Sequence, residues 1–177
     1  MVKDADFYLD VLKAKFRQID PKKYYLSYSG GKDSHLIYWF IKDWLPKHDP
    51  EMAAEGYSDI PIVAVNTRME HPDILRRIID NSDTVLLPAM KPKDIKEKYG
   101  IPVFTKHHDA MIGRYQRGSR RPYLLAYING TKNGGKTMYK LNKQARELLL
   151  SDQLPMVDNK CCDILKKKPL KAYGKDS

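Results

Sequence analysis

Cysteine is scarce in this sequence: Cys161 and Cys162 are the only two, and they are adjacent. Adjacent cysteines are poorly placed for an unstrained disulfide, and two thiols cannot supply the four thiolates of a typical iron–sulfur cluster. We therefore expect neither a disulfide framework nor a complete iron–sulfur site in this chain. The five histidines have no Cys/His spacing typical of zinc, so no metal site is predicted either.

Long apolar runs are also missing, because no stretch approaches the roughly 20 apolar residues of a membrane span. The first sixteen residues, MVKDADFYLDVLKAKF, lack the apolar core and cleavage site of a signal peptide. We therefore expect a cytoplasmic protein without a membrane partner. The same residues predict an amphipathic helix within residues 1–20, with one apolar face made of Phe7, Tyr8, Val11, Leu12 and Phe16.

Negative charge is in deficit: 32 Lys and Arg face 22 Asp and Glu, a net charge of +10, which indicates an anionic partner or substrate. No zinc-finger, RRM or helix-turn-helix signature accompanies this charge, so nucleic acid is one option beside a phosphate-bearing small molecule. The 177 residues, 42% of them hydrophobic, fit a single globular domain whose oligomeric state stays open. Within it, residues 152–177 form a basic tail that carries the two cysteines.

The most informative stretch is YYLSYSGGKDS, residues 24–34. A short run of β-formers stops at two glycines, and a helical pattern follows at once. Such a junction presents backbone N–H groups to an anion at a helix N-terminus, and glycine allows a close approach to the main chain. Lys32 adds a cation, and Ser34 or Asp33 is expected to cap the helix. A plain turn would also use Gly-Gly and Ser, but the whole set favours a phosphate site: Ser29, Gly30, Gly31, Lys32, Asp33 and Ser34.

The next segments alternate between strands and helices. Residues 60–65 are a continuous apolar run, typical of a strand buried on both faces, and residues 84–87 predict a third strand. Helical patterns cover residues 74–79 and 92–99, the second closed by Gly100. This order predicts a doubly wound α/β fold with a mainly parallel sheet and helices on both faces. Ligands bind at the carboxyl ends of such strands, so loops 29–34 and 66–71 should share one crevice.

Beyond Gly100 the pattern is weaker. Residues 101–104 predict an extended piece, 106–115 a helix, 118–122 a basic loop, and 138–150 a helix. Residues 123–128 fit either a strand or a helix.

A second phosphate-loop pattern occurs at Gly130–Thr137, GTKNGGKT, which satisfies the Walker A consensus. Only forty residues follow it, without a second apolar strand ending in Asp to hold Mg²⁺. We therefore favour a glycine-rich basic loop over a P-loop.

Four motifs carry a family resemblance. Ser29–Ser34 resembles the SGGxDS PP-loop of the adenine nucleotide α-hydrolase superfamily, which includes ATP pyrophosphatases and sulfonucleotide reductases. Cys161–Leu170, CCDILKKKPL, is similar to the C-C-x-x-x-K-x-x-P-L stretch of the phosphoadenosine phosphosulfate (PAPS) reductase family and its phage-type relatives. Asn66-Thr67 is related to that family's D-T-G, and Tyr99–Pro102 to its Y-G-x-P. The resemblance covers about residues 22 to 171.

The departures from the family pattern concern both the site and the chemistry. Arg68 stands where D-T-G has glycine, and Asn66 where it has aspartate. The family's sulfonucleotide segment, its C-terminal E-C-G-I-H cysteine and the second cysteine pair of its iron–sulfur members do not occur before Ser177. We therefore expect a shortened or truncated member.

The resemblance implies that an adenine nucleotide, whether PAPS, adenosine phosphosulfate (APS) or ATP, lies on the PP-loop together with Asn66, Thr67 and Arg68. Basic groups expected to close over the anion are Lys106, Arg114, Arg120, Arg121, Lys166, Lys167 and Lys168. The catalytic candidates are Cys161 and Cys162, as thiolates, and His71, as a general acid or base.

Three functions follow from these expectations. The first is a PAPS or APS reductase-like protein of sulfur metabolism, with a thiol reductant protein such as thioredoxin as partner. The second is a Mg-ATP pyrophosphatase that adenylates its substrate in nucleic-acid sulfur modification, in which case the basic surface would meet DNA or RNA. The third is a nucleotide-binding module without chemistry of its own.

Overall fold

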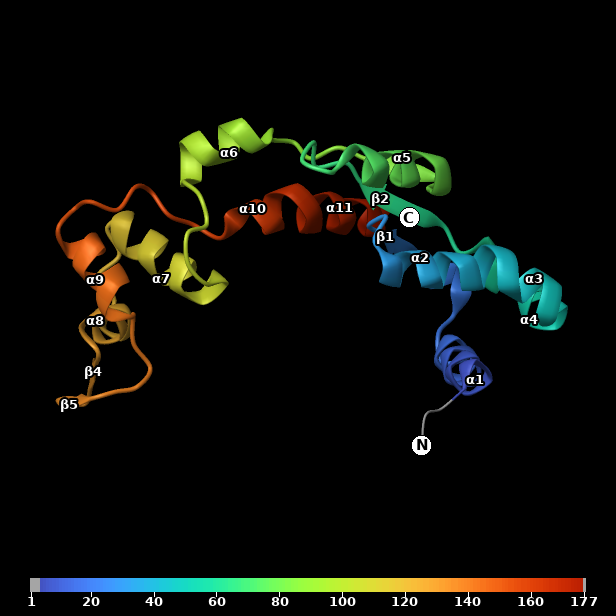
Figure 1. The fold of residues 1–177 in the computed structure, drawn as a ribbon, viewed down its shortest axis with the longest axis horizontal. Coiled ribbons are helices and arrows are strands. Elements are labelled where there is room, and N and C mark those ends of the chain that lie inside the picture. Colours follow the sequence, from blue (N-terminus) through green and yellow to red (C-terminus); the bar gives the residue numbers. More distant parts are fainter. Residues whose placement is uncertain (1–3, 177) are drawn as a thin grey trace. The chain divides into compact units, whose positions relative to one another are not determined.

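A computed structural model describes residues 4–176, which divide into two compact units (Figure 1). The first unit contains residues 4–87 together with 172–176, and the second contains residues 88–171. No helix among residues 4–176 is both long enough and apolar enough to cross a membrane.

The first unit begins with α1, Ala5–Phe16, which Asp4 caps by accepting from the Phe7 N–H. The predicted helix is therefore present from residue 5, and residues 1–3 of the prediction lie outside the described residues. Its buried face differs from the predicted one: Leu9, Leu12 and Phe16 pack against the core, whereas Phe7, Tyr8 and Val11 are exposed. The i, i+3, i+7 spacing of the buried set makes one helix face.

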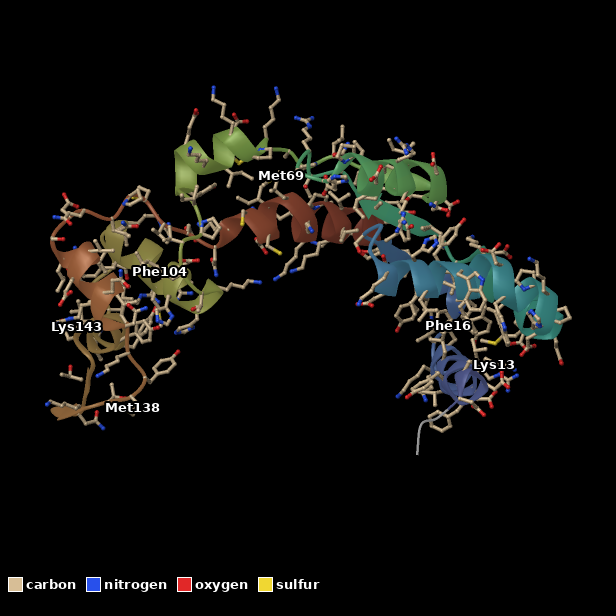
Figure 2. The ribbon with its side chains drawn as sticks, in the orientation of Figure 1. Lys13, Phe16, Met69, Phe104, Met138 and Lys143 are labelled. Carbon is tan, nitrogen blue, oxygen red and sulfur yellow. The ribbon has the colours of Figure 1, made fainter. Side chains whose placement is uncertain are left out.

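Lys13, which follows Leu12 on α1, connects this helix to the rest of the unit through an ion pair. Its Nζ lies 2.7 Å from Oδ2 of Asp49, and the Phe16 ring packs on Phe40 at 5.2 Å between centroids (Figure 2). A 3₁₀ turn, Pro21–Lys23, then leads into the sheet.

The sheet has three parallel strands in the order β1-β2-β3: Leu26–Tyr28, Ile62–Val65 and Thr84–Leu86. Tyr28 pairs with Ala64, and Ala64 with Val85. All four residues of β2 are buried, as the continuous apolar run predicts for a central strand. The α/β class with a parallel sheet flanked by helices is therefore confirmed, and the doubly wound arrangement stays a prediction.

The helix after β1 is longer than predicted. It runs through α2 (Lys32–Trp39), a π-helical turn (Phe40–Trp44) and α3 (Leu45–His48) as one continuous rod (Figure 1). Proline discourages helix continuation, so the sequence predicts an end near Trp44–Pro46, and this prediction is wrong. The Leu45 N–H donates to the Phe40 carbonyl in the wider π turn just before Pro46, which makes room for the proline ring.

Two short elements, α4 (Pro50–Ala54) and a 3₁₀ turn (Tyr57–Asp59), complete the crossover to β2. Helix α5, Pro72–Asn81, follows β2 and covers one face of the sheet. Its Ile74 and Ile78 pack against the sheet residues Tyr28, Ile62 and Ala64.

The second unit is helical apart from one small hairpin. Its elements are α6 (Pro92–Tyr99), α7 (Lys106–Gln116), α8 (Pro122–Asn129), β4 (Thr131–Lys132), β5 (Gly135–Lys136), α9 (Lys143–Leu150), α10 (Lys160–Cys162), a π turn (Asp163–Lys167) and α11 (Lys168–Asp176), whose last residues belong to the first unit. Gly100 closes α6 with φ +89°, and its N–H donates to Lys96, which confirms that predicted boundary.

Three further predictions for this part of the chain are resolved. Residues 123–128 are helical, and the predicted basic tail is helical from Lys160 to Asp176. The predicted helix at 138–150 begins only at Lys143, because Asn142 accepts a hydrogen bond from the Ala145 N–H and so caps α9 there.

We predict unequal losses of stability when alanine replaces each of the two loop glycines. Gly30 has φ +71°, and a Cβ there would lie 3.0 Å from Ile74 Cγ2 and 3.1 Å from the Ile74 carbonyl oxygen. Gly30→Ala should lower the free energy of unfolding by about 2 kcal/mol, through backbone strain and this clash. Urea denaturation monitored by circular dichroism measures the change.

Gly31→Ala is the matched control, since Gly31 has φ −79° and a Cβ there would meet only Ser29 Oγ at 3.4 Å. Its free energy of unfolding should stay within about 0.5 kcal/mol of the parent. Equal losses in both variants would contradict the packing described for Gly30.

Candidate functional site

The candidate site begins with the turn between β1 and α2. Gly30 adopts the left-handed conformation, and Gly31 is the N-cap of α2 with extended backbone angles. Because glycine has no side chain, no side-chain acceptor caps this N-terminus. The amides of the first turn are therefore left for another acceptor, as in an anion site.

The two serines of the turn bond to each other and to the loop backbone. Ser34 Oγ donates to the Gly31 carbonyl at 3.0 Å, lies 3.0 Å from Ser29 Oγ and accepts from the Ser29 N–H at 3.2 Å. The prediction that Ser34 or Asp33 caps α2 is therefore wrong. Ser34 instead lies inside the first turn and closes the loop on itself, while the Lys32 and Asp33 side chains are exposed.

The second loop, Asn66–His71, follows β2. Asn66 Oδ1 accepts from the Arg68 N–H at 2.8 Å, an Asx turn that folds the chain back directly after the strand. The buried Thr67 hydroxyl donates to Glu70 Oε1 at 2.6 Å, and Glu70 Oε2 accepts from the Met69 N–H at 3.3 Å. The loop is thus held from within by one carboxylate, while the Met69 side chain is exposed (Figure 2).

Arg68 has the backbone conformation that glycine favours. Its φ is +66°, in the left-handed region that costs a residue with a side chain about 1 kcal/mol. Arg68 is also the residue that stands where the D-T-G motif has glycine. Arg68 thus combines a left-handed backbone with an exposed guanidinium at the strand end.

Glu70 is the residue of this loop whose pKa is clearly shifted. Burial would raise the pKa of its carboxyl, but hydrogen bonds from the Thr67 hydroxyl and from backbone N–H groups together hold the pKa below its usual value of 4.5. Glu70 is therefore ionised at neutral pH and serves as the acceptor that organises this loop.

His71 has a structural position at the start of α5. As the N-cap residue it accepts from the Asp73 N–H with Nδ1 at 3.3 Å, and the same nitrogen lies 3.6 Å from the Asp73 carboxylate. This placement accounts for the residue without catalysis, and its acid–base role stays a prediction.

The two loops leave the same edge of the sheet. β1 and β2 are parallel neighbours in register, so both loops follow carboxyl ends of adjacent strands. The structure thus brings Ser29–Ser34 and Asn66–Arg68 to one edge within one unit.

An aromatic group beside the first loop was not predicted as part of the site. The buried Tyr28 hydroxyl lies 2.9 Å from His35 Nδ1, and the His35 ring stacks on Tyr38 with 12° between planes. Burial raises the pKa of Tyr28, so its phenol stays protonated. The i, i+3 spacing of His35 and Tyr38 on α2 is the only sequence signal for this arrangement.

The predicted closing groups all lie in the second unit. Arg120 is already engaged, because its Nη1 donates to the carbonyls of Tyr115 and Ser119 and its guanidinium stacks 3.9 Å from the Tyr115 ring centroid. The others are exposed: Lys106 and Arg114 on α7, Arg121 as N-cap of α8, Lys166 and Lys167 in the π turn, and Lys168 at the start of α11.

The cysteine pair also lies in the second unit, on α10. Both thiols are free and half-buried, and Cys161 packs against a small core that contains Ile95 and Ile164. Among residues 4–176, no three His, Cys, Asp or Glu side chains gather as a metal site would require.

The Walker A-like stretch Gly130–Thr137 is a β-hairpin. Thr131 pairs with Lys136 across a tight turn at Asn133 and Gly134, which both have positive φ. It follows a helix rather than a strand, and five residues separate its end at Thr137 from α9. The P-loop alternative is therefore excluded, and the preferred basic loop takes the form of this hairpin.

No protein-family model, curated protein or solved structure matches the chain.

Replacing the Glu70 carboxylate should remove a pH-dependent part of the stability. The lowered pKa means that Glu70 stabilises the fold above about pH 4.5 and that this contribution is lost as pH falls through the folded-state pKa. Glu70→Gln should therefore be less stable than the parent at pH 7, and the difference should shrink toward pH 3. Thermal unfolding at several pH values measures this, with exposed Glu55→Gln as control; a difference that grows on acidification would contradict it.

Two substitutions at Arg68 separate its backbone from its side chain. Arg68→Gly should be more stable than Arg68→Ala by about 1 kcal/mol, because only glycine adopts φ +66° without strain. Urea denaturation of both variants measures the difference, and equal stabilities would show that the left-handed turn does not persist in solution.

Proposed function

We propose that the chain binds an adenine nucleotide by its phosphate or phosphosulfate group at Ser29–Ser34, as a PAPS reductase-like PP-loop protein. The observation that carries this proposal is the strand, left-handed glycine and uncapped helix N-terminus at Tyr28–Lys32. Three features support an anion there: the first-turn amides, the open side of Gly31, and Lys32 beside it.

Each loop residue has a role in this proposal. The amides of the first α2 turn bind the anion, and the bonded serines hold the loop in the conformation that presents them. Lys32 neutralises charge, while Asp33 stays clear of the anion because like charges repel. Arg68, from the neighbouring strand end, supplies a second cation of the same unit.

Reduction of a sulfonucleotide needs a thiolate that attacks sulfur, and this chain offers only Cys161 and Cys162. The family that the chain resembles does not use that pair as its nucleophile. We therefore assign nucleotide binding to this chain and the thiolate to a partner reductant protein such as thioredoxin.

Both thiols are half-buried. This favours a second candidate function, a reaction of ATP, because chemistry on ATP needs no thiol. A PP-loop pyrophosphatase breaks the bond between the α- and β-phosphates of Mg-ATP, transfers the adenylyl group to an acceptor and releases pyrophosphate. Its dependence on Mg²⁺ distinguishes it from the reductase.

Loop variants test the proposal directly. Ser34→Ala combined with Gly31→Val should weaken nucleotide binding at least tenfold, about 1.4 kcal/mol, because the valine fills the open side of the loop and the alanine removes its internal bond. Isothermal titration calorimetry with PAPS, APS and ATP, each with and without Mg²⁺, measures the affinity.

Lys32→Gln and Lys47→Gln form a matched charge pair for the same titration, since both lysines are exposed in the first unit. Only Lys32→Gln should weaken binding.

Preference for a sulfonucleotide without metal supports the reductase branch, and preference for Mg-ATP supports the pyrophosphatase. Binding without turnover indicates a non-catalytic module. Unchanged nucleotide affinity in a folded Ser34→Ala, Gly31→Val double variant would contradict the PP-loop assignment.

A further inference from the structure

Positive charge is concentrated in the second unit. Residues 88–171 contain 19 Lys and Arg but only 7 Asp and Glu, a net charge of +12, whereas the rest of the chain contains 13 and 15, a net charge of −2. The excess cations thus lie outside the unit that carries the proposed nucleotide loop. A separate anionic partner is expected to bind them.

Two tyrosines on this unit are exposed yet held in place by basic side chains of α7. Tyr139 is 62% exposed, and its hydroxyl lies 2.6 Å from His107 Nε2. Tyr123 is 46% exposed, and its hydroxyl accepts from Arg114 Nη1 at 3.3 Å. His107 and Arg114 are two helical turns apart, so the tethers are spaced by about 10 Å along α7.

The buried Tyr127 supports the outer ring. Its ring centroid lies 5.1 Å from that of Tyr139 and 5.2 Å from that of His107, both edge-on. Because Tyr127 is fixed in the core of the unit, the Tyr139 ring rests on a rigid base. An exposed ring that is already oriented loses little entropy when it stacks on a ligand.

The cations around these rings are not neutralised by the protein. Lys106, Arg114 and Lys140 are exposed, and within the described part of the chain none of them lies within 4 Å of a carboxylate. Other basic residues of the unit do have acidic partners: Arg117 pairs with Asp158, and Lys143 lies 3.9 Å from Glu147. Unpaired cations therefore lie beside the exposed rings, although exposed cations such as Lys166 and Lys167 also occur elsewhere on this unit.

We propose that this α7–α8 surface binds single-stranded nucleic acid, with bases stacked on the tyrosine rings and phosphates on the surrounding cations. Oriented aromatic rings among unpaired Lys and Arg are the combination that single strands bind, because unpaired bases have free faces. A duplex encloses its base faces and would use the cations alone. The surface consists of Lys106, His107, Arg114, Tyr123, Tyr139 and Lys140.

Fluorescence anisotropy of the full chain with labelled DNA and RNA strands of about 16 nucleotides tests this, with a hairpin duplex of equal charge for comparison. The single strands should bind more tightly than the duplex. Log affinity should fall linearly with log salt concentration, by about 0.7 per phosphate contacted. Equal or tighter binding of the duplex, or no binding of single strands at low salt, would overturn the proposal.

Substitutions at Tyr139 separate stacking from charge. Tyr139→Leu should weaken single-strand binding about tenfold, because the stacking ring is lost, while Tyr139→Phe should stay within about twofold of the parent. Equal losses in the two variants would show that the ring face is not what binds. Circular dichroism confirms that both variants are folded.

A matched charge control tests the location of the surface. Lys106→Gln with Arg114→Gln should reduce the salt slope by about 1.4, whereas Lys93→Gln with Lys143→Gln, which removes equal charge from α6 and α9, should change it little. The same loss in both pairs would mean diffuse attraction and would overturn the assigned surface.

This inference does not rest on the nucleotide loop, so the two can fail separately. Gly31→Val should impair nucleotide binding and leave oligonucleotide affinity unchanged, and Tyr139→Leu should do the reverse. A loss of oligonucleotide binding in Gly31→Val would overturn the assignment of single strands to α7 and α8.

Discussion

The close approach of Gly30 to Ile74 is the constraint on which the candidate site depends. A Cβ at Gly30 would meet the side chain and the carbonyl oxygen of Ile74, so only glycine lets the β1–α2 turn lie against α5. Because α5 begins directly after the Asn66–His71 loop, this contact also fixes that loop beside the first one. The parallel pairing of β1 and β2 and this single missing side chain together produce the site's geometry.

The two proposed binding functions use different physics. The loop at Ser29–Ser34 offers backbone amides and few side-chain charges, which suits one compact anion held at short range. The α7–α8 surface offers dispersed cations and oriented rings, which suits a polymer that repeats charge and base. The division of charge, −2 against +12, matches this difference between the units.

The sequence predicted the elements whose signals are local and strong, such as β2 from its apolar run and α6 from its terminal Gly100. Prediction from the sequence was wrong where tertiary packing or a hydrogen bond determines where an element ends. Pro46 is an example, because the preceding π turn accommodates it within the helix. The sequence also predicted that the two candidate loops follow strand ends, but the inward bond of Ser34 and the left-handed Arg68 depend on backbone geometry that residue types do not specify. The tethered Tyr139 joins α7 to a loop 32 residues away, beyond any periodic pattern.

The most direct test is an NMR titration of the ¹⁵N-labelled chain with PAPS, APS and Mg-ATP, which reports on each backbone amide. The account predicts that a saturating nucleotide shifts the amides of Gly31–Ser34 most, with smaller changes at Asn66–Arg68, because the first-turn N–H groups bind the anion. Saturable shifts centred on the hairpin Gly130–Thr137, or on any other part of the second unit, would contradict it.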